Sequence, residues 1–228
     1  MTVTRGAEHY LQAIYALTAE RRTVIGARLA QHLRVSAPSV TQALKRLERD
    51  GLVVLVAKGD RKEVHLTAAG HRIGEASTRR HRLIETWLVS SLKLRSTEAH
   101  EAAERLEGGF NELLLTRLFD AIGRPFTCPH GNPIPGWGRI DHDGVYLDTV
   151  AAGDVVGVGR ITEEAEADLD LLAYLERHGV FPRTRLEIVA VDRLSGAVTA
   201  RTGTGVEVRI EKRSAALIFV RPMLAPTA

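Results

Sequence analysis

Histidine and glutamate residues follow one face of two neighbouring predicted helices. His100, Glu104 and Glu107 are spaced at i, i+4 and i+7, which places their side chains on one stripe of a helix. In the helix before it, His81 and Glu85 have i, i+4 spacing. Imidazole and carboxylate groups on two facing helices can bind a divalent transition-metal ion between them. The alternative is that both helix faces are charged and simply exposed to solvent. For either helix taken alone, we would favour this alternative.

A second possible pair of metal ligands is Cys128 with His130. Both lie in the segment 124–138, which is rich in proline and glycine and is predicted to be a loop. No matching second pair follows nearby, so we expect both residues to have a structural role. Cys128 is the single cysteine of the chain, which excludes an internal disulfide bond and is typical of a reducing cytosol.

The elements that must position these residues begin with a predicted DNA-binding unit. Helical periodicity covers residues 8–17 and 24–33, and a tight turn leads to a third helix at residues 37–50. Two short strands, joined by a basic turn, follow at residues 52–56 and 63–66. A helix-turn-helix followed by a hairpin predicts a winged helix.

The third helix is predicted to be the recognition helix that enters the major groove of double-stranded DNA. Short hydroxyl and amide side chains near its start can reach base edges. Basic side chains further along the helix and at the hairpin turn can contact phosphates. The alternative is a polar face that meets only solvent. The residues expected to contact DNA are Ser36, Pro38, Ser39, Thr41, Gln42, Lys45, Arg46, Arg49, Lys58, Arg61 and Lys62.

The charge distribution favours the same assignments. The chain has 228 residues and a formal net charge of +3. Basic residues outnumber acidic ones between Arg5 and Arg82, and acidic residues cluster between Glu98 and Asp170. The first region suits phosphate contacts and the second suits cations. No apolar run reaches the roughly 18 residues of a membrane helix, and the N-terminus lacks the apolar core of a signal peptide. We therefore expect a soluble, cytoplasmic protein without membrane contact.

Two longer helices are predicted next, one for residues 67–92 and one that begins at a Ser96 or Thr97 cap and runs to about Ala121. The second helix contains the pair Gly108–Gly109, so it is either kinked there or closely approached by another backbone. Its apolar side exceeds what one helix pair needs, which predicts a homodimer interface. That side consists of Leu106, Phe110, Leu113, Leu114 and Leu118.

The last third of the chain is predicted to form a small SH3-like β-barrel, with one helix at residues 168–178. Its expected strands are residues 146–147, 154–161, 185–192, 197–202, 206–210 and 216–220. The predicted fold class is therefore α+β with several domains. These are a winged helix-turn-helix at residues 1–73, a helical dimerisation and metal-binding domain at 74–140, and an SH3-like domain at 141–228.

The chain resembles the diphtheria toxin repressor family of iron- and manganese-dependent transcriptional repressors. The resemblance covers nearly the whole chain, and the order and spacing of its motifs agree with the family. It rests on AEHYLQAIYAL, VSAPSVTQALKRLERDGLV, RRHRLIETWL, AHEAAERLE, CPHGNPIPG and a C-terminal module like the FeoA-type, ferrous-transport-associated SH3-like domain. The resemblance implies a homodimer that binds a palindromic operator and represses metal-uptake genes.

The resemblance also implies two metal sites. The ancillary site matches the family at His81, Glu85 and His100, and a carboxylate from the third domain, Asp168 or Glu166, is expected to complete it.

The primary site departs from the family pattern, because Gly108 stands where the family has a histidine. We hypothesise that His9 supplies the missing imidazole beside Glu104 and Glu107, with Gln12 or a water completing the site. Metal would then hold the DNA-binding domain against the dimerisation helices. The alternative is a weakened primary site, with tight binding only at the ancillary site.

Carboxylate and imidazole ligands without a thiolate or thioether favour harder divalent ions. The resemblance implies that Glu104, at a position where the family has cysteine or glutamate, goes with manganese selectivity, so Mn²⁺ is the first choice and Fe²⁺ the second. Zn²⁺, Co²⁺ or Cd²⁺ would also bind in vitro. A winged-helix regulator that senses an organic ligand remains an alternative, as does an activator of the same architecture. A metallohydrolase is disfavoured because HExxH is absent: the residue four positions after His100 is Glu104.

Overall fold

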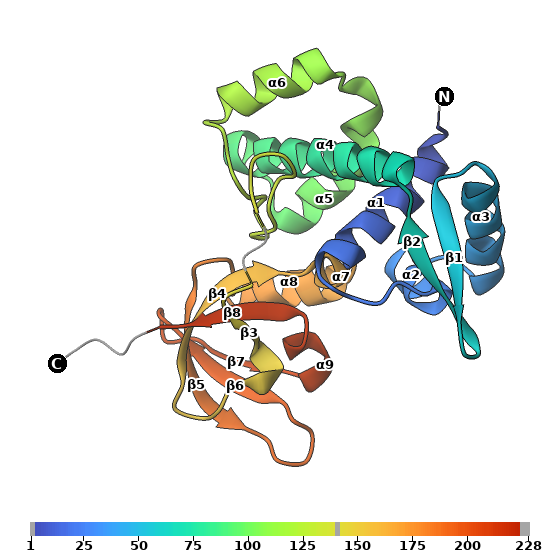
Figure 1. The fold of residues 1–228 in the computed structure, drawn as a ribbon. Helices are drawn as coiled ribbons and strands as arrows, with labels where there is room; N and C mark the ends of the chain where they lie inside the picture. The colour runs from blue at the N-terminus through green and yellow to red at the C-terminus, as the bar shows by residue number, and fades with distance from the viewer. Residues whose placement is uncertain (1–2, 140–141, 224–228) are drawn as a thin grey trace.

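The computed structural model describes residues 3–139 and 142–223, and Figure 1 shows their arrangement. A winged-helix unit, a helical layer and a C-terminal β domain meet around the N-terminal helix α1 and the long helix α4. The predicted domain boundary at residues 140–141 lies outside the described residues. Among the residues described, no helix is long and apolar enough to cross a membrane.

The N-terminal unit has the predicted winged-helix order. Ser36 caps α3 by accepting a hydrogen bond from the Ser39 amide, and Val40, Leu44 and Leu47 of α3 are buried, as its periodicity predicts. The two strands pair as an antiparallel hairpin. The elements are α1 (Arg5–Ala19), α2 (Gly26–His32), α3 (Ala37–Arg49), β1 (Val53–Lys58) and β2 (Arg61–Leu66).

Helix α4 (Ala68–Leu92) connects the DNA-binding unit to the helical layer without a break. The domain boundary predicted at residues 73–74 therefore falls inside one continuous helix. Helix α1 packs closely on α4 at Gly74, where a Cβ would lie 2.6 Å from the Leu11 carbonyl oxygen. A side chain at this glycine would push the two helices apart, so Gly74 permits the contact that brings α1 near the metal-ligand candidates.

The prediction of one helix from Ser96 to Ala121 was wrong. Helix α5 (Ser96–Leu106) ends in a short 3₁₀ turn, η1 (Glu107–Gly109), and a separate helix α6 (Glu112–Ala121) follows. No described heavy atom lies within 4 Å of a Cβ built on either glycine of η1, so close backbone approach is not the reason for the pair. The break follows from the helix cost of two adjacent glycines and from the Asn111 cap, which starts α6.

The predicted cap of α5 was also wrong by one residue. Arg95 is the N-cap, and Glu98 accepts a hydrogen bond from the Arg95 amide, as in a capping box.

The C-terminal domain contains an antiparallel sheet with the strand order β3-β8-β4-β5-β6-β7 among the described residues. All the strands predicted from the sequence are present, with shifts of one or two residues at most of their ends. The short elements α7, α9 and η2 were not predicted. The elements are β3 (Val145–Tyr146), η2 (Leu147–Thr149), β4 (Val155–Ile161), α7 (Glu163–Glu166), α8 (Leu169–Arg177), β5 (Arg185–Val191), β6 (Val198–Thr202), β7 (Glu207–Ile210), α9 (Lys212–Ala215) and β8 (Ile218–Pro222).

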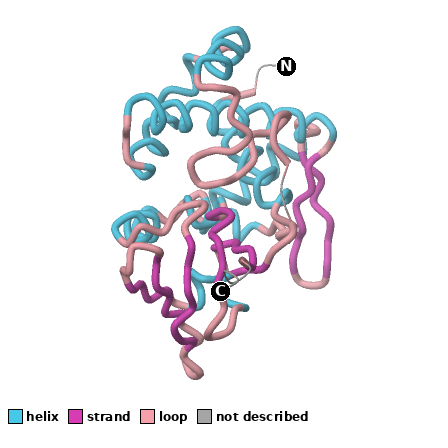
Figure 2. The backbone as a smooth tube through the Cα atoms, turned by 90° about the vertical axis from the view of Figure 1, so that its left-hand side faces the viewer, coloured by secondary structure: helices cyan, strands magenta, loops and turns pink. Residues whose placement is uncertain are grey.

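Separate hydrophobic cores support these units. One core fills the winged helix, one fills the inside of the C-terminal sheet, and two smaller ones lie between α4, α5, α6 and the loop after α6. Figure 2 shows most of the helices in the upper part of the molecule and the strands of the C-terminal sheet, with a few short helices beside them, in the lower part. The polar groups considered next lie between these cores rather than inside one of them.

Candidate metal centre and DNA-binding surface

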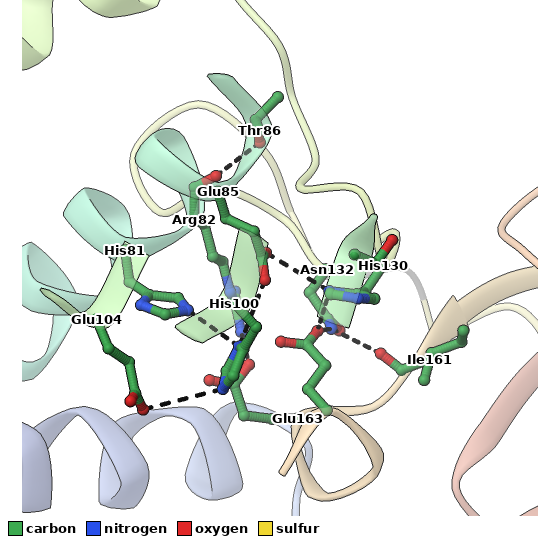
Figure 3. Close-up of polar contacts among 12 residues, drawn as sticks. His81, Arg82, Glu85, Thr86, His100, Glu104, His130, Asn132, Ile161 and Glu163 are labelled. Atoms are coloured by element: carbon green, nitrogen blue, oxygen red, sulfur yellow. Dashed lines mark hydrogen bonds and ion pairs between the residues drawn. The ribbon is translucent and has the colours of Figure 1, made fainter. Parts of the chain in front are cut away.

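Two helices bring together the imidazole and carboxylate groups of the predicted ancillary site. His81 and Glu85 lie one turn apart on α4 and are fully buried, and His100 faces them from α5. His81 Nε2 lies 3.3 Å from His100 Nδ1, which lies 3.4 Å from Glu85 Oε1. One ligand atom from each residue falls within 4.8 Å of the others, so the three can share one ion. Figure 3 shows their side chains converging.

A second group of ligand atoms shares Glu85. Its Oε2 lies 3.5 Å from His130 Nδ1, and Cys128 completes a buried trio whose ligand atoms also lie within 4.8 Å of one another. His130 Nδ1 lies 3.4 Å from Glu166 Oε1 of α7. We call Glu85, Cys128, His130 and Glu166 the buried cluster.

In the sequence analysis, Glu85 and Glu166 were placed at the ancillary site, whereas Cys128 and His130 were given a structural role, because no second ligand pair lies near them in the chain. The partners come instead from α4 and α7. The loop is held against β4 by two hydrogen bonds: the Ile161 amide donates to the His130 carbonyl at 2.8 Å, and Asn132 Nδ2 donates to the Ile161 carbonyl at 2.7 Å. Asn132 Nδ2 also donates to Glu166.

Gly131 lets this loop approach β4 closely. Its φ is +84°, and a Cβ there would lie 2.4 Å from the Gly159 carbonyl oxygen. The signal available in the sequence was therefore the glycine and asparagine that follow Cys128 and His130, since they fix the loop's place.

The buried cluster has polar atoms that require a further partner. Both carboxylate oxygens of Glu85, both ring nitrogens of His130 and Glu166 Oε2 are buried and make no hydrogen bond to the residues that the structure describes. Unpaired buried polar groups are costly and rare in native proteins. A divalent cation fits this donor set of carboxylates, imidazole and thiol. The donor set therefore agrees with a metal ion bound by this chain's own residues.

The pKa values of His81 and Glu166 differ strongly from those of the free side chains. Burial alone would lower the pKa of His81, but the hydrogen bond with Glu107 and the charge of Glu85 raise it to about 9. Burial raises the pKa of Glu166 to about 7 against the opposing charge of His130. The neighbouring carboxylates favour the charged form of His81, whereas burial disfavours the charged form of Glu166, and such strongly shifted pKa values in a buried group of side chains are typical of a functional site.

The structure only partly assembles the predicted primary site. His9 Nε2 lies 3.9 Å from Glu104 Oε1, and both side chains are about half exposed, at 53% and 48%. Glu107 Oε1 instead lies 2.6 Å from His81 Nδ1. Gln12 accepts a hydrogen bond from Ser77 Oγ at 3.0 Å. Glu104 also lies 3.9 Å from His100 Nε2, so the half-exposed pair of His9 and Glu104 adjoins the centre.

A cavity of about 600 Å³ separates α1 and α2 from α5 at this point. His9, Gln12, Glu104 and Glu107 line it. His32 of α2, which the sequence reasoning did not consider, lines it too.

Two further sequence expectations concern Gly108 and Asp168. Gly108 lies beside Glu107, and around its Cβ position the described chain leaves open space to at least 4 Å. A histidine at this position would meet no obstruction at its Cβ. The carboxylate of Asp168 accepts a hydrogen bond from the Leu171 amide at 3.1 Å and caps α8. Of the two predicted carboxylate donors, Glu166 is therefore the one beside the centre.

The predicted DNA-contacting residues lie on an exposed surface. Ser36 Oγ and Ser39 Oγ lie 2.8 Å apart at the start of α3, and Thr41 donates to the Ala37 carbonyl at 3.0 Å. The wing-tip residue Lys58 pairs with Glu63 at 3.1 Å. The whole predicted set is exposed: Ser36, Pro38, Ser39, Thr41, Gln42, Lys45, Arg46, Arg49, Lys58, Arg61 and Lys62.

Three family models match the chain in order. Residues 2–60 match the iron dependent repressor, N-terminal DNA binding domain, and residues 67–136 match the iron dependent repressor, metal binding and dimerisation domain. Residues 145–222 match the FeoA domain.

Curated relatives cover most of the chain. It is 38% identical over 192 residues to the iron-dependent repressor IdeR of Mycobacterium tuberculosis (strain ATCC 25618 / H37Rv), which spans 79% of this chain and 82% of that protein. It is 30% identical over 222 residues to the diphtheria toxin repressor of Corynebacterium glutamicum, covering 90% of this chain and 95% of that protein.

Solved structures share the architecture. A manganese-dependent transcriptional repressor in complex with manganese is 32% identical, with a TM-score of 0.77, and covers 95% of this chain and 100% of its own. The manganese regulator SloR is 28% identical, with a TM-score of 0.79, and covers 98% and 100%. These relatives are DNA-binding repressors and not enzymes. The chain belongs to the diphtheria toxin repressor family and is a metal-responsive, DNA-binding transcriptional regulator.

Proposed function

We propose that this protein is a cytoplasmic homodimeric repressor of metal-uptake genes that binds a palindromic operator when manganese, or as second choice iron, is available. Zn²⁺, Co²⁺ and Cd²⁺ are expected to bind in vitro. The observation that carries the proposal is the set of unpartnered ligand atoms on Glu85, His130 and Glu166. It lies where the helical layer meets the C-terminal domain, next to His81 and His100.

We assign the ligands to three adjacent groups. The first two share Glu85, and the third adjoins the first through Glu104 and His100. His81, Glu85 and His100 form one group, and the buried cluster adds a thiol on the far side of Glu85. The thiol of Cys128 softens that donor set and favours iron, cobalt or zinc there, whereas the first group keeps the imidazole and carboxylate donors that suit manganese.

His9 and Glu104, with Glu107, are proposed as the third group, on the half-exposed side. His9 belongs to α1 and Glu104 to α5, so shared ligation would hold the DNA-binding unit against the helical layer. The ion supplies positive charge that lets these groups stay close without repulsion. Gln12 is a weaker candidate because its amide oxygen already accepts from Ser77.

Operator binding is assigned to α3 and the wing. Two recognition helices can occupy successive major grooves only if a dimer fixes their separation. The exposed apolar side chains Leu113 (65%) and Leu114 (46%) on α6, with Leu106 (40%) on α5, offer the surface for a two-fold partner. By linkage, metal and operator must each tighten the binding of the other, with a coupling of roughly 1–3 kcal/mol.

Operator affinity measured with and without metal tests this proposal. Labelled duplexes are first selected from a random pool in the presence of manganese, and their affinity is then measured by fluorescence anisotropy at fixed salt. We expect the metal-free protein to bind the selected duplex at least about fivefold more weakly. Equal affinities in manganese and in chelator would contradict metal sensing and would favour the regulator of an organic ligand.

A further inference from the structure

The acidic side chains of the short helix α7 (Glu163–Glu166) contact different parts of the molecule. In Figure 1 it lies at the junction between the FeoA domain and α1. Glu163 faces α4, Glu164 faces the DNA-binding unit and Glu166 faces the buried cluster. One turn of helix is stiff at this length, so a shift at one of these contacts is felt at the others.

The contact with α4 is a buried ion pair. Glu163 Oε2 lies 2.7 Å from Arg82 Nη2, and both side chains are 7% exposed. Arg82 Nη1 also donates to the Pro133 carbonyl at 2.6 Å, in the loop that carries His130. Arg82 thus joins α7 to α4 and to the metal-binding loop.

The contacts with the DNA-binding unit are made by Glu20 and by Glu164. Glu20, at the end of α1, accepts hydrogen bonds from Arg160 Nη1 and from the Glu163 amide, both at 3.0 Å. Glu164 lies 3.1 Å from Arg28 Nε and 3.7 Å from Arg22 Nε. Arg28 belongs to α2, the first helix of the helix-turn-helix, so α7 holds this motif directly.

The fourth residue of α7, Glu166, connects this helix to the buried cluster. Glu166 receives a hydrogen bond from Asn132 and lies 3.4 Å from His130 Nδ1, while its Oε2 makes no hydrogen bond to the described residues. The carboxylate is therefore held at the edge of the cluster with one oxygen left for a further partner. An occupied cluster fixes Glu166, and with it the position of Glu163 and Glu164.

We propose that α7 is a coupling element in which Glu164 positions the helix-turn-helix according to the occupancy of the buried cluster. This inference rests on the proposed function, because it needs the cluster to bind metal. Glu164 is a positioning residue, because its carboxylate pairs with Arg22 and Arg28 of the DNA-binding unit.

Hydrogen exchange measured by mass spectrometry, with and without manganese, tests the proposal on the full chain. The variants are Glu164→Gln and, as a matched control, Glu207→Gln. Glu207 forms an exposed ion pair with Arg201 at 2.7 Å within the FeoA sheet. In the wild type and in the control, manganese should slow exchange at least about fivefold both in residues 127–134 and in residues 20–33. In Glu164→Gln the protection of 127–134 should stay and that of 20–33 should be largely lost.

The decisive quantity is the difference between the metal-loaded and metal-free protein, which a purely structural role of Glu164 would not change. Equal manganese-dependent protection of residues 20–33 in Glu164→Gln and in the wild type would overturn the inference while leaving the proposed function intact. A wild type with no manganese effect at either segment would overturn the proposed function and the inference together. Should Glu164→Gln fold poorly, Arg28→Gln removes the other half of the contact without altering α7, and the same outcomes decide.

Discussion

The buried cluster and the half-exposed pair of His9 and Glu104 use similar side chains in different surroundings. The cluster has fully buried Glu85 and Glu166, with oxygen atoms that make no hydrogen bond within the described part of the chain, whereas His9 and Glu104 are about half exposed and can be solvated. Water competes weakly with the buried cluster for a cation and strongly with the half-exposed pair of His9 and Glu104. We therefore expect the cluster and its neighbours on α4 to bind metal tightly, and the His9 side to bind it weakly and to respond to changes in concentration.

The largest effect is expected for Glu85→Gln, because Glu85 belongs to both buried ligand groups. The variant keeps the side-chain shape but removes the charge that both groups share. Manganese affinity measured by isothermal titration should fall by more than about 100-fold, beyond the 10–100-fold cost of losing an outer-shell partner. Glu207→Gln, an exposed carboxylate paired with Arg201 in the FeoA sheet, is the control. An affinity equal to that of the wild type would remove Glu85 from the ligand set.

A smaller loss is expected for Asn132→Ala. Asn132 donates to Glu166 and to the Ile161 carbonyl and so orients a ligand without being one. Losing such an outer-shell partner should weaken manganese binding by about 10–100-fold. An unaltered titration would mean that Glu166 is held by α7 alone.

Adding a histidine tests the half-exposed side from the opposite direction. Gly108 lies in η1 next to Glu107, and its Cβ position is open within the described chain. Gly108→His should raise the affinity of the weaker metal on the order of tenfold, about 1.4 kcal/mol. The measurement is a two-site titration, with Gly109→His as the control for the loss of a glycine. A gain of equal size in both variants would argue against a site at Glu107.

The sequence was a good guide wherever the determining forces are local. The helices predicted at residues 8–17, 24–33, 37–50 and 67–92 and the C-terminal strands depend mainly on neighbouring residues, and their predicted ranges agree with the structure to within three residues. The prediction that one helix continues through Gly108–Gly109 was wrong, because Asn111 caps the start of a new helix, α6.

Cys128 and His130 were not assigned to the metal site, because they are far from Glu85 and Glu166 in the chain. Glu85, His130 and Glu166 meet only through the packing of α4, the loop after α6 and α7. Periodicity shows which residues share a helix face, as for His81 with Glu85, but it does not show which loop will cover that face. The sequence also could not decide whether Asp168 or Glu166 is the carboxylate donor from the C-terminal domain. The structure shows that Asp168 caps α8.

The smallest effect is expected for His9→Ala, and it decides whether the loss of the family's histidine has been compensated. His9 Nε2 lies 3.9 Å from Glu104 Oε1 and is more than half exposed, so its removal leaves the buried ligands untouched. We expect the tight metal to bind as in the wild type and the weaker metal to lose on the order of tenfold in affinity, about 1.4 kcal/mol. His71→Ala, an exposed histidine that pairs with Glu75 on α4, is the control. Two metals with unchanged affinities in His9→Ala would sink the compensation hypothesis, and α1 would then be held to the rest of the molecule by α4 and α7 without metal ligation of its own.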